Sequence, residues 1–297
     1  PINIDSFSII DTGCTSGNGF IEPGESVTMS VTMRNIAGCG GLPVFVGYIS
    51  TTTPGVAITS AGSSFLPPPA IGSTSTNTVP YQFTVAPYVA CGTKIDLFVD
   101  FGVFGYGSLM LPIEGPIFVG HPVATVLLSE NFDGAVVPNL PDGWNSALLA
   151  GTSNPWTTSA TFAASGTNSA FCADIATTSH NELQSPSIPI PAGTEYVRVE
   201  LDETHNNELD IERKGWDGAL MRILLGGTRY FSGSAGNMTP FYPWQMNRSS
   251  AAENPLHDLS CWSGDTTPNF AHYATDFLDM GGQTIQVLLG MSTDSAI

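Results

Sequence analysis

The chain has few basic residues and no long apolar run. Only 8 of its 297 residues are Lys or Arg, against 26 Asp or Glu, which gives a formal net charge of −18 at pH 7. Such a charge repels nucleic acid and anionic lipid, so we expect neither a nucleic-acid partner nor membrane insertion. No apolar run approaches the roughly 18 residues that a membrane helix needs. The chain starts at Pro1 without a signal-like segment, and we expect a mature or excised piece of a secreted or surface protein.

Cysteine is scarce as well. The five cysteines show no CxxC spacing, which disfavours a zinc site and favours disulfides in an exported protein. Cys172 and Cys261 are the two in the second half of the chain, and we predict that they pair. Among Cys14, Cys39 and Cys91 we predict a Cys14–Cys39 bridge, because both lie in Gly-rich turns that flank one hairpin. The sequence leaves open which of these three thiols is unpaired, and whether some cysteines are buried as small apolar residues.

Helical spacing of apolar residues is also missing. The 32 Gly and 22 Pro indicate short strands joined by turns, so the predicted fold class is all-β. Alternation with period two, or a short apolar run, predicts strands. These strands are 26–34, 44–50, 56–60, 81–85, 95–101, 123–128, 196–202, 219–225 and 284–290. We expect an Ig-like β-sandwich over 1–115, a linker over 116–122 stiffened by two prolines, and a jelly-roll β-sandwich over 123–297.

The sequence contains no catalytic signature. Neither GxSxG nor a P-loop nor a dinucleotide fingerprint occurs, and the five histidines are scattered without HExxH spacing. Carboxylates concentrate between Glu200 and Asp217, Glu208 among them. A glycosidase needs two carboxylates across a cleft, but a solvated acidic loop or a second cation site is the simpler interpretation. We therefore expect a protein that is not an enzyme.

The first domain carries a recognisable motif. The segment DTGCTSGNGFIEPGE at 11–25, followed by SVTMSVTMRN, resembles the Ig-like domains of secreted bacterial proteins that contain an xEPGE segment. The glycines beside Asn18 permit a tight loop, which would bring Asp11, Asn18 and Glu22 together as oxygen donors for Ca²⁺. The alternative is that Asp11 and Asn18 only hydrogen-bond the turn backbone.

The second domain carries a series of shorter motifs. They are ENFDG at 130–134, LPDGW at 140–144, NPW at 154–156, SGTNSAF at 165–171, NELQSPSI at 181–188 and WDGALMRI at 216–223. In this order they resemble the cleaved-adhesin and MAM-like jelly rolls, a family often appended to bacterial surface proteins and secreted peptidases.

The resemblance implies a structural Ca²⁺ near the first strand of the jelly roll, held by Glu130 and Asp133. The residues themselves agree, because two carboxylates around an inward-pointing Phe132 would offer hard oxygens at a strand end. Asp174 and Asp217 are predicted as further ligands, with a plain surface position as the alternative. The ion would stabilise the fold by mass action.

Tyr242, Trp244 and Trp262 lie in a region rich in Gly, Pro and Asn. Exposed rings there would stack on sugar faces and bind surface glycans; the alternative is that they fill the core. For Trp144 and Trp156 we expect core positions.

Family members usually continue past the strand that matches 284–294, whereas this chain stops at Ile297. Either the sequence is a fragment, or the jelly roll lacks its last strand and leaves an open sheet edge. The extended segment Ile2 to Ile10 of a neighbouring copy could fill that edge and build a filament.

The leading functional prediction is a non-catalytic extracellular adhesion or binding module, stabilised by Ca²⁺, from a bacterial surface or secreted protein. Its partners would be other protein chains or surface glycans. The alternatives are a structural subunit of a filament assembled by strand addition, and an accessory region of a secreted peptidase or glycosidase.

Overall fold

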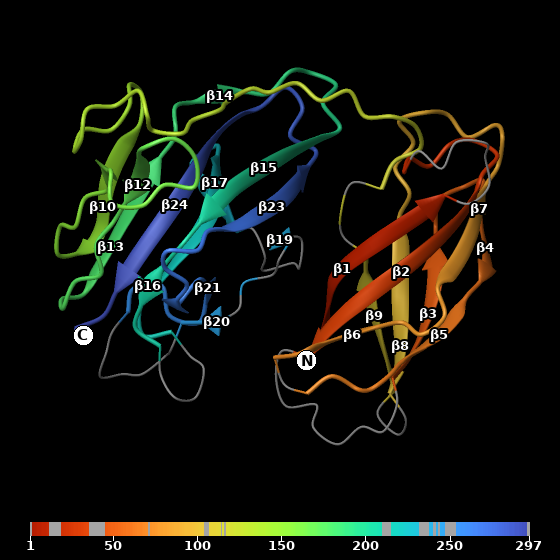
Figure 1. Ribbon diagram of the computed structural model, residues 1–297. Coiled ribbons are helices and arrows are strands. Elements are labelled where there is room, and N and C mark those ends of the chain that lie inside the picture. The colour runs from red at the N-terminus through yellow and green to blue at the C-terminus, as the bar shows by residue number, and fades with distance from the viewer. Residues whose placement is uncertain are drawn as a thin grey trace. The chain divides into compact units, whose positions relative to one another are not determined.

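The described part of the chain is built from β-strands. The computed structural model describes residues 2–11, 19–35, 45–70, 72–103, 107–113, 115, 117–209, 215–231, 238–239, 242, 244–246 and 254–295. These residues form antiparallel sheets, turns and bends, and no helix (Figure 1), which confirms the all-β fold class. Two compact units emerge: Pro1–Thr125 with Ala235–Thr239, and Val126–Ser234 with Pro240–Ile297.

The first unit contains two packed sheets. Its strands are β1 (Ile2–Asp11), β2 (Ser26–Asn35), β3 (Phe45–Thr51), β4 (Val56–Ser60), β5 (Gly62–Phe65), β6 (Thr74–Thr76), β7 (Tyr81–Val85), β8 (Leu97–Val103) and β9 (Gly107–Pro112). One sheet has the order β1-β2-β7-β4 with β6 beside β2, and the other has the order β5-β3-β8-β9. All five strands predicted for this part of the sequence are present; two have the predicted bounds, and the ends of the others differ by one or two residues.

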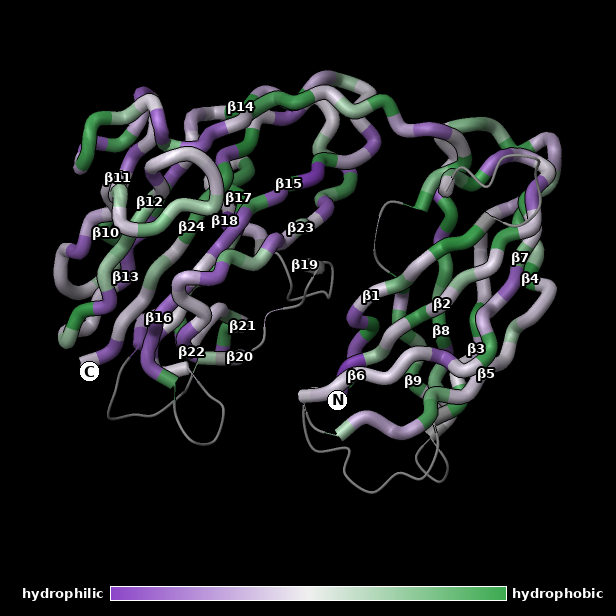
Figure 2. The backbone as a smooth tube through the Cα atoms, in the orientation of Figure 1, coloured by the Kyte–Doolittle hydropathy of each residue, from purple (hydrophilic) through white to green (hydrophobic). Residues whose placement is uncertain are grey.

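Alternation along the strands creates the core of the first unit. On β2, Val27, Met29, Val31 and Met33 are buried while the residues between them are partly exposed, a pattern that Figure 2 shows as alternating colours. Phe65 and Phe101 of the second sheet meet with ring centroids 5.3 Å apart. Side chains from both sheets therefore share one apolar core, and its removal from water stabilises the sandwich.

The core extends into the stretch predicted to be a linker. Ile117 and Val119 are buried in it, and isolated bridges join Lys94 to Phe118 and Ile21 to Val119. Residues 117–119 thus pack with the first unit, since they hydrogen-bond the segment just before β8 as well as filling the core of the unit.

The first strand is already paired within its own sheet. Antiparallel pairing with β2 runs from Ile2↔Asn35 to Asp11↔Val27, and the Ile2 and Ile4 side chains are buried. The expectation of a free N-terminal strand is therefore wrong, because these alternating apolar residues complete the core of the unit. Donating β1 to a neighbouring copy would first require stripping it from β2.

The motif EPGE forms a turn that leads into β2. The N–H of Glu22 donates to Oε2 of Glu25 (2.7 Å), and the N–H of Glu25 donates back to the carbonyl of Glu22 (3.2 Å). Pro23 and Gly24 occupy the central positions, and Gly24 has φ 92°, as the third position of a type II turn requires. The motif is accounted for by this turn.

The remaining strands follow in chain order. They are β10 (Asn145–Gly151), β11 (Thr157–Ser159), β12 (Ser169–Phe171), β13 (Ser179–Gln184), β14 (Ile188–Pro189), β15 (Tyr196–Glu203), β16 (Asn206–Asn207), β17 (Gly218–Leu225), β18 (Thr228–Phe231), β19 (Met238–Thr239), β20 (Trp244–Gln245), β21 (Ser260–Cys261), β22 (Gly264–Asp265), β23 (Ala271–Leu278) and β24 (Thr284–Thr293). The largest sheet of the second unit has the order β10-β13-β24-β17-β18, with β14 beside β24. The strands predicted at 196–202, 219–225 and 284–290 are confirmed as β15, β17 and β24.

The strand predicted at 123–128 does not form. This segment pairs with none of the described strands, and Val123 is 94% exposed. An apolar run of high β-propensity needs a neighbour that accepts and donates its backbone hydrogen bonds. The sequence pattern could not reveal that this neighbour is missing from the described part of the chain.

A second core lies between β15–β23 and the largest sheet. Ile223, Ile285 and Phe277 form its centre, and Val197 and Val199 of β15 pack against them. Arg198, between these valines, faces outward and forms a two-pronged ion pair with Asp276 across the strands. Two faces packed on one core make this unit a β-sandwich too.

A buried ion cluster crosses the central strand β24. Arg222 of β17 reaches over Gly290 of β24 to bond Glu182 of β13, and Arg229 binds the same carboxylate at 2.7 Å. A Cβ at Gly290 would lie 3.5 Å from the guanidinium, in van der Waals contact with it. Arg222 also lies 3.0 Å from Nε2 of His180. Burial, followed by the charge of Arg222, lowers the pKa of His180 to about 4, so this imidazole is neutral at pH 7.

Candidate metal centre

Carboxylates gather where the central strands of the second unit begin and end. Glu208, Asp217 and Asp294 each place a ligand oxygen within 4.8 Å of the others. They are the one group of three or more such side chains that the described residues contain. The carboxyl of Asp174 lies within hydrogen-bonding reach of Asp217 and adds a fourth. We call Asp174, Glu208, Asp217 and Asp294 the acidic cluster.

Strand register explains why the acidic cluster assembles. Asp217 directly precedes β17 and Asp294 directly follows β24, and the two strands run antiparallel with Gly218 opposite Ser292. The start of one strand and the end of the other therefore coincide. Glu208 follows β16, and Asp174 comes shortly after β12. The register of β17 and β24 thus brings Asp217 and Asp294 together, although they are 77 residues apart in the chain.

The acidic cluster contains carboxylate oxygens that lack donors. Oδ1 of Asp174, Oε2 of Glu208 and Oδ2 of Asp217 are all enclosed, and no hydrogen-bond donor reaches them. The Asp217 side chain is itself completely buried. Enclosed carboxylate oxygens without a donor destabilise a fold by about 1–3 kcal/mol or more each. A proton or a bound cation is therefore needed among them.

Burial favours the protonated forms of these acids when no cation is bound. It raises the pKa of Asp217 to about 8, an increase that the neighbouring Asp174 and Asp294 charges support and the Asp294 N–H opposes. Burial also raises the pKa of Asp174 and of Glu208, and the charge of Asp294 adds to both. A divalent cation would offset the same repulsion while leaving the carboxylates ionised.

The donor chemistry fits a hard cation. The acidic cluster offers carboxylate oxygens and neither imidazole nor thiolate, and Ca²⁺ takes about six to eight oxygen ligands in flexible geometry. Zn²⁺ prefers nitrogen and sulfur donors in tetrahedral sites. The residues present therefore fit Ca²⁺, with Asp174, Glu208, Asp217 and Asp294 as the side chains that would hold it.

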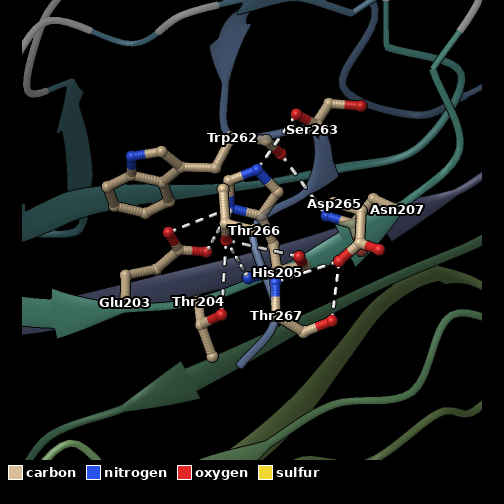
Figure 3. A network of polar contacts seen from close by, with 9 residues as sticks. All are labelled: Glu203, Thr204, His205, Asn207, Trp262, Ser263, Asp265, Thr266 and Thr267. Carbon is tan, nitrogen blue, oxygen red and sulfur yellow. Dashed lines mark hydrogen bonds and ion pairs between the residues drawn. The ribbon is translucent and has the colours of Figure 1, made fainter. Parts of the chain in front are cut away.

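A polar network around His205 holds the segment that carries Glu208 (Figure 3). Nδ1 of His205 lies 2.9 Å from Oε1 of Glu203, and Nε2 lies 3.0 Å from the carbonyl of Ser263. The backbone N–H of His205 donates to Oγ1 of Thr266 (3.0 Å). Asn207 reaches the carbonyl of Trp262 at 3.4 Å. The end of β15 and the β16 segment are thereby fixed to the chain between β21 and β23.

Two further side chains hold the backbone around the acidic cluster. The hydroxyl of Ser263 donates to the carbonyl of Glu208 (3.0 Å). The amide of Asn254 donates to the carbonyls of Trp216 (2.7 Å) and Ser292 (3.3 Å), and its oxygen accepts from the Ser292 hydroxyl. The backbone at Glu208, beside Asp217 and near Asp294 is thus held by hydrogen bonds, which preorganises the site for an ion.

The structure brings together two of the predicted ligands and adds two. Asp174 and Asp217 meet, as a shared metal site would require. Sequence reasoning noticed Glu208 only within an acidic stretch and missed Asp294. The signal for Asp294 was an acid shortly after the last predicted strand, 284–290, but its partner across the sheet follows only from the β17–β24 register.

Glu130 and Asp133 lie outside the acidic cluster. Oδ1 of Asp133 accepts hydrogen bonds from the N–H groups of Thr167 (2.7 Å) and Asn168 (2.9 Å), which lower its pKa. Glu130 accepts from the N–H of Phe132 (2.7 Å), whose φ is 65°. The ENFDG motif is thus a turn that clamps another loop, and the Ca²⁺ role of these two acids stays a prediction.

The Ca²⁺ site predicted in the first domain also stays a prediction. Asn18 and the side chain of Asp11 lie outside the described residues. Glu22 contributes its backbone to the EPGE turn.

The predicted Cys172–Cys261 disulfide is wrong, because both thiols are free. Cys172 donates to the carbonyl of Asn154 (3.3 Å), and burial raises its pKa to about 12. Cys261 is buried on β21 against Gly218. Each sulfur fills its own packing site as a small apolar group. Cys14 and Cys39 lie outside the described residues, and Cys91 is free and exposed.

The predicted sugar platform is wrong for two of its three rings. Tyr242 and Trp262 are buried, their ring centroids 4.8 Å apart, and Trp262 also meets Tyr273. The Tyr242 hydroxyl accepts from the Met221 N–H (2.7 Å) and donates to the Met221 carbonyl (3.3 Å). It therefore occupies the side of β17 at Met221, which the pairing of β17 with β18 over 222–225 does not reach. Trp244 is half-buried, as are Trp144 and Trp156.

Fold and site together define an all-β sandwich protein with a buried carboxylate centre. No protein-family model and no curated protein matches the chain. In the described part of the chain, no helical segment has the length and apolar character that a membrane crossing requires.

Proposed function

We propose that this chain is a non-catalytic adhesion or binding module of a secreted or surface protein, and that the acidic cluster binds a structural Ca²⁺. The observation that carries the proposal is the convergence of enclosed carboxylate oxygens without donors at Asp174, Glu208 and Asp217. The bound ion would supply positive charge and coordination bonds, and the protein would supply a preformed ring of oxygens.

The location of the acidic cluster supports a stabilising role. Its residues come from the chain after β12, from the β16 segment, from the start of β17 and from the end of β24. An ion held by all four would tie the segments that carry Asp174 and Glu208 to the paired ends of β17 and β24. Asp217 and Asp294 are almost fully enclosed, so these acids do not face a substrate-sized surface as a glycosidase pair would.

Calcium titration of the whole chain tests the proposal. Thermal unfolding is followed in chelator and in rising Ca²⁺, and binding is measured by calorimetry. At a free Ca²⁺ concentration of about 100 Kd the ion should add about 2.7 kcal/mol of stability. Mg²⁺ should bind more weakly, since it prefers to keep its own waters. If Ca²⁺ changes neither the unfolding temperature nor the calorimetric trace, the metal no longer belongs to the proposal.

A filament subunit is the second candidate, favoured by the strand β10. β10 lies at the end of its sheet, and its Leu148 and Leu149 side chains are exposed. Edge strands with exposed apolar residues invite pairing with another chain. Light scattering against protein concentration tests this: growth of large assemblies supports it, and a constant monomer mass contradicts it.

A further inference from the structure

We propose that the outer face of the β5-β3-β8-β9 sheet binds an arginine side chain of a partner protein, with Tyr48 as the stacking surface and Asp100 as the hydrogen-bond acceptor. The register of this sheet places Gly62, Tyr48, Asp100 and Met110 in one row across its four strands. Tyr48 and Asp100 face away from the core, because Ile49, Val99 and Phe101, their neighbours along the strands, are buried; Gly62 and Met110 lie beside them in the same row.

Tyr48 provides a ring supported from one side. The ring lies over Gly62, where an added Cβ would be 3.0 Å from Cε1 and 3.3 Å from Cδ1 of the tyrosine. Any larger residue at position 62 would push the ring away. Tyr48 is nevertheless 55% exposed, so the side of the ring that does not contact Gly62 is open to solvent.

Asp100, on the next strand, is an acceptor whose hydrogen bonding is incomplete. Its side chain is half-buried, and its Oδ1 atom is enclosed without a donor within reach. The residue opposite it on β9, Met110, is 60% exposed. Because methionine is unbranched and flexible, Met110 can swing aside and admit a donor. A charged N–H donor would satisfy the carboxylate.

Arginine fits both features at once. Its guanidinium is planar, stacks on aromatic rings and directs its N–H groups outward within its plane. A guanidinium lying on Tyr48 would therefore point donors toward the neighbouring strand, about 4.8 Å away, where Asp100 lies. The face of the guanidinium then stacks on Tyr48, while its N–H edge pairs with Asp100.

The residues around Asp100 leave its negative charge unbalanced, which favours a cationic partner. The other outward positions of this sheet, by register, are neutral: Val46, Ser50, Ser64, Phe98, Gly102, Ser108 and Pro112. None of them supplies a positive charge to Asp100. The chain as a whole carries −18, which attracts basic partners and speeds their association. This site belongs to the first unit and does not depend on the acidic cluster.

The test uses a capped pentapeptide, Ser-Thr-Arg-Thr-Ser, titrated into the isotope-labelled whole chain and followed by NMR up to about 10 mM, the range of weak single-residue contacts. We expect shifts at Tyr48, Asp100 and their neighbours on β3 and β8. Tyr48→Ala and Asp100→Asn should each weaken binding about ten-fold. Tyr88→Ala is the matched control, since Tyr88 is 79% exposed on a turn of the same unit; it should bind as the wild type does.

Two further ligands test which property of arginine the site recognises. The same peptide with citrulline keeps the shape of arginine without its charge, and it should bind at least about ten-fold more weakly. Equal binding of the citrulline peptide overturns the proposal. Three other results would also overturn it. Methyl β-glucoside shifts the signals of these residues and the arginine peptide does not, both variants bind with unchanged affinity, or no shifts appear at all. Preserved spectral dispersion in Asp100→Asn shows that this variant is folded, so a loss of binding reports on the site. The titration is repeated in chelator, which separates a failure of the Ca²⁺ site from a failure of the arginine site.

Discussion

The backbone N–H of Asp294 donates a hydrogen bond of 2.6 Å to Oδ1 of Asp217. This contact joins the end of β24 to the start of β17 at the acidic cluster. It satisfies one oxygen of Asp217 and leaves the other, Oδ2, enclosed without a donor. A single carboxylate thus links the two strands, and its second oxygen still needs a proton or a bound ion. The stability of the fold should therefore depend on both the metal and the pH.

Glu208→Gln should abolish most of the stabilisation by Ca²⁺. The amide keeps the size of the side chain but removes one of the clustered charges, and neutral oxygens hold a hard cation more weakly. The measurement is the shift in unfolding temperature between chelator and saturating Ca²⁺.

The matched control is Glu200→Gln, an exposed acid of β15 outside the acidic cluster. It should keep the full Ca²⁺ response. An equal loss in both variants would mean that the effect of Ca²⁺ is general screening of the negative charge.

Without a cation, the contribution of Asp217 to stability should fall as pH rises. Its ordinary pKa of 3.8 becomes about 8 in the fold, so the folded chain retains a proton that the unfolded chain releases. Stability from this group is complete below pH 4 and is lost between about pH 4 and pH 8.

The measurement is thermal unfolding in chelator across that range, for the wild type and for Asp217→Asn. The amide does not titrate, so the difference between the two proteins should shrink or reverse with rising pH. A difference that is constant with pH would show that Asp217 does not hold this proton. Saturating Ca²⁺ should reverse the trend, because protons then compete with the ion.

His180 should destabilise the fold in acid. Its pKa falls from 6.5 to about 4 in the folded chain, so its stability contribution is present above pH 6.5 and is lost as pH falls toward 4. NMR of the imidazole gives the titration directly. A midpoint near 6.5 in the folded chain would contradict the buried, neutral ring.

Glu182→Gln should destabilise the second unit by about 3–5 kcal/mol, because it leaves two guanidiniums without their shared, buried anion. Urea unfolding measures the loss. Asp276→Asn removes an ion pair whose Arg198 partner is exposed, and it should cost less than about 1 kcal/mol. Similar losses in the two variants would contradict the buried character of the Glu182 cluster.

Cys172 and Cys261 should be alkylated only after unfolding. Cys261 is buried and Cys172 is half-buried, and burial raises both pKa values, so the reactive thiolate is rare in the folded chain. Mass spectrometry before and after denaturation counts the modified thiols, with exposed Cys91 as the internal control. A Cys172–Cys261 peptide recovered under non-reducing conditions would contradict the free thiols.

Local patterns of apolar and polar residues were enough to predict most of the long strands. The alternation in β2 and β15 depends only on one face being buried, which a sequence states directly. The strand expected at 123–128 failed because pairing requires a partner, which a local pattern cannot supply. Tyr242 and Trp262 were misplaced for a related reason: a segment rich in Gly, Pro and Asn indicates a loop, but whether its rings cover a sheet edge depends on where that edge is.

The acidic cluster was only half accessible to sequence reasoning. Asp174 and Asp217 were identified from nearby motifs. Their meeting with Glu208 and Asp294 follows from the antiparallel register of β17 and β24 and from the hydrogen bonds of Ser263 and Asn254. Such contacts join residues far apart in the chain, so they follow from tertiary structure and not from local spacing.

The central position of β24 has a mechanical consequence. This strand is hydrogen-bonded to β13 on one side and to β17 on the other, and Asp294 follows directly after it. A tensile load applied to the backbone beyond Asp294 must shear two ladders at once, and it meets the Asp217 contact before either of them. Ca²⁺ bound there would act as a latch at the point where the load enters, so the force that the sandwich withstands would follow the ion content of its surroundings.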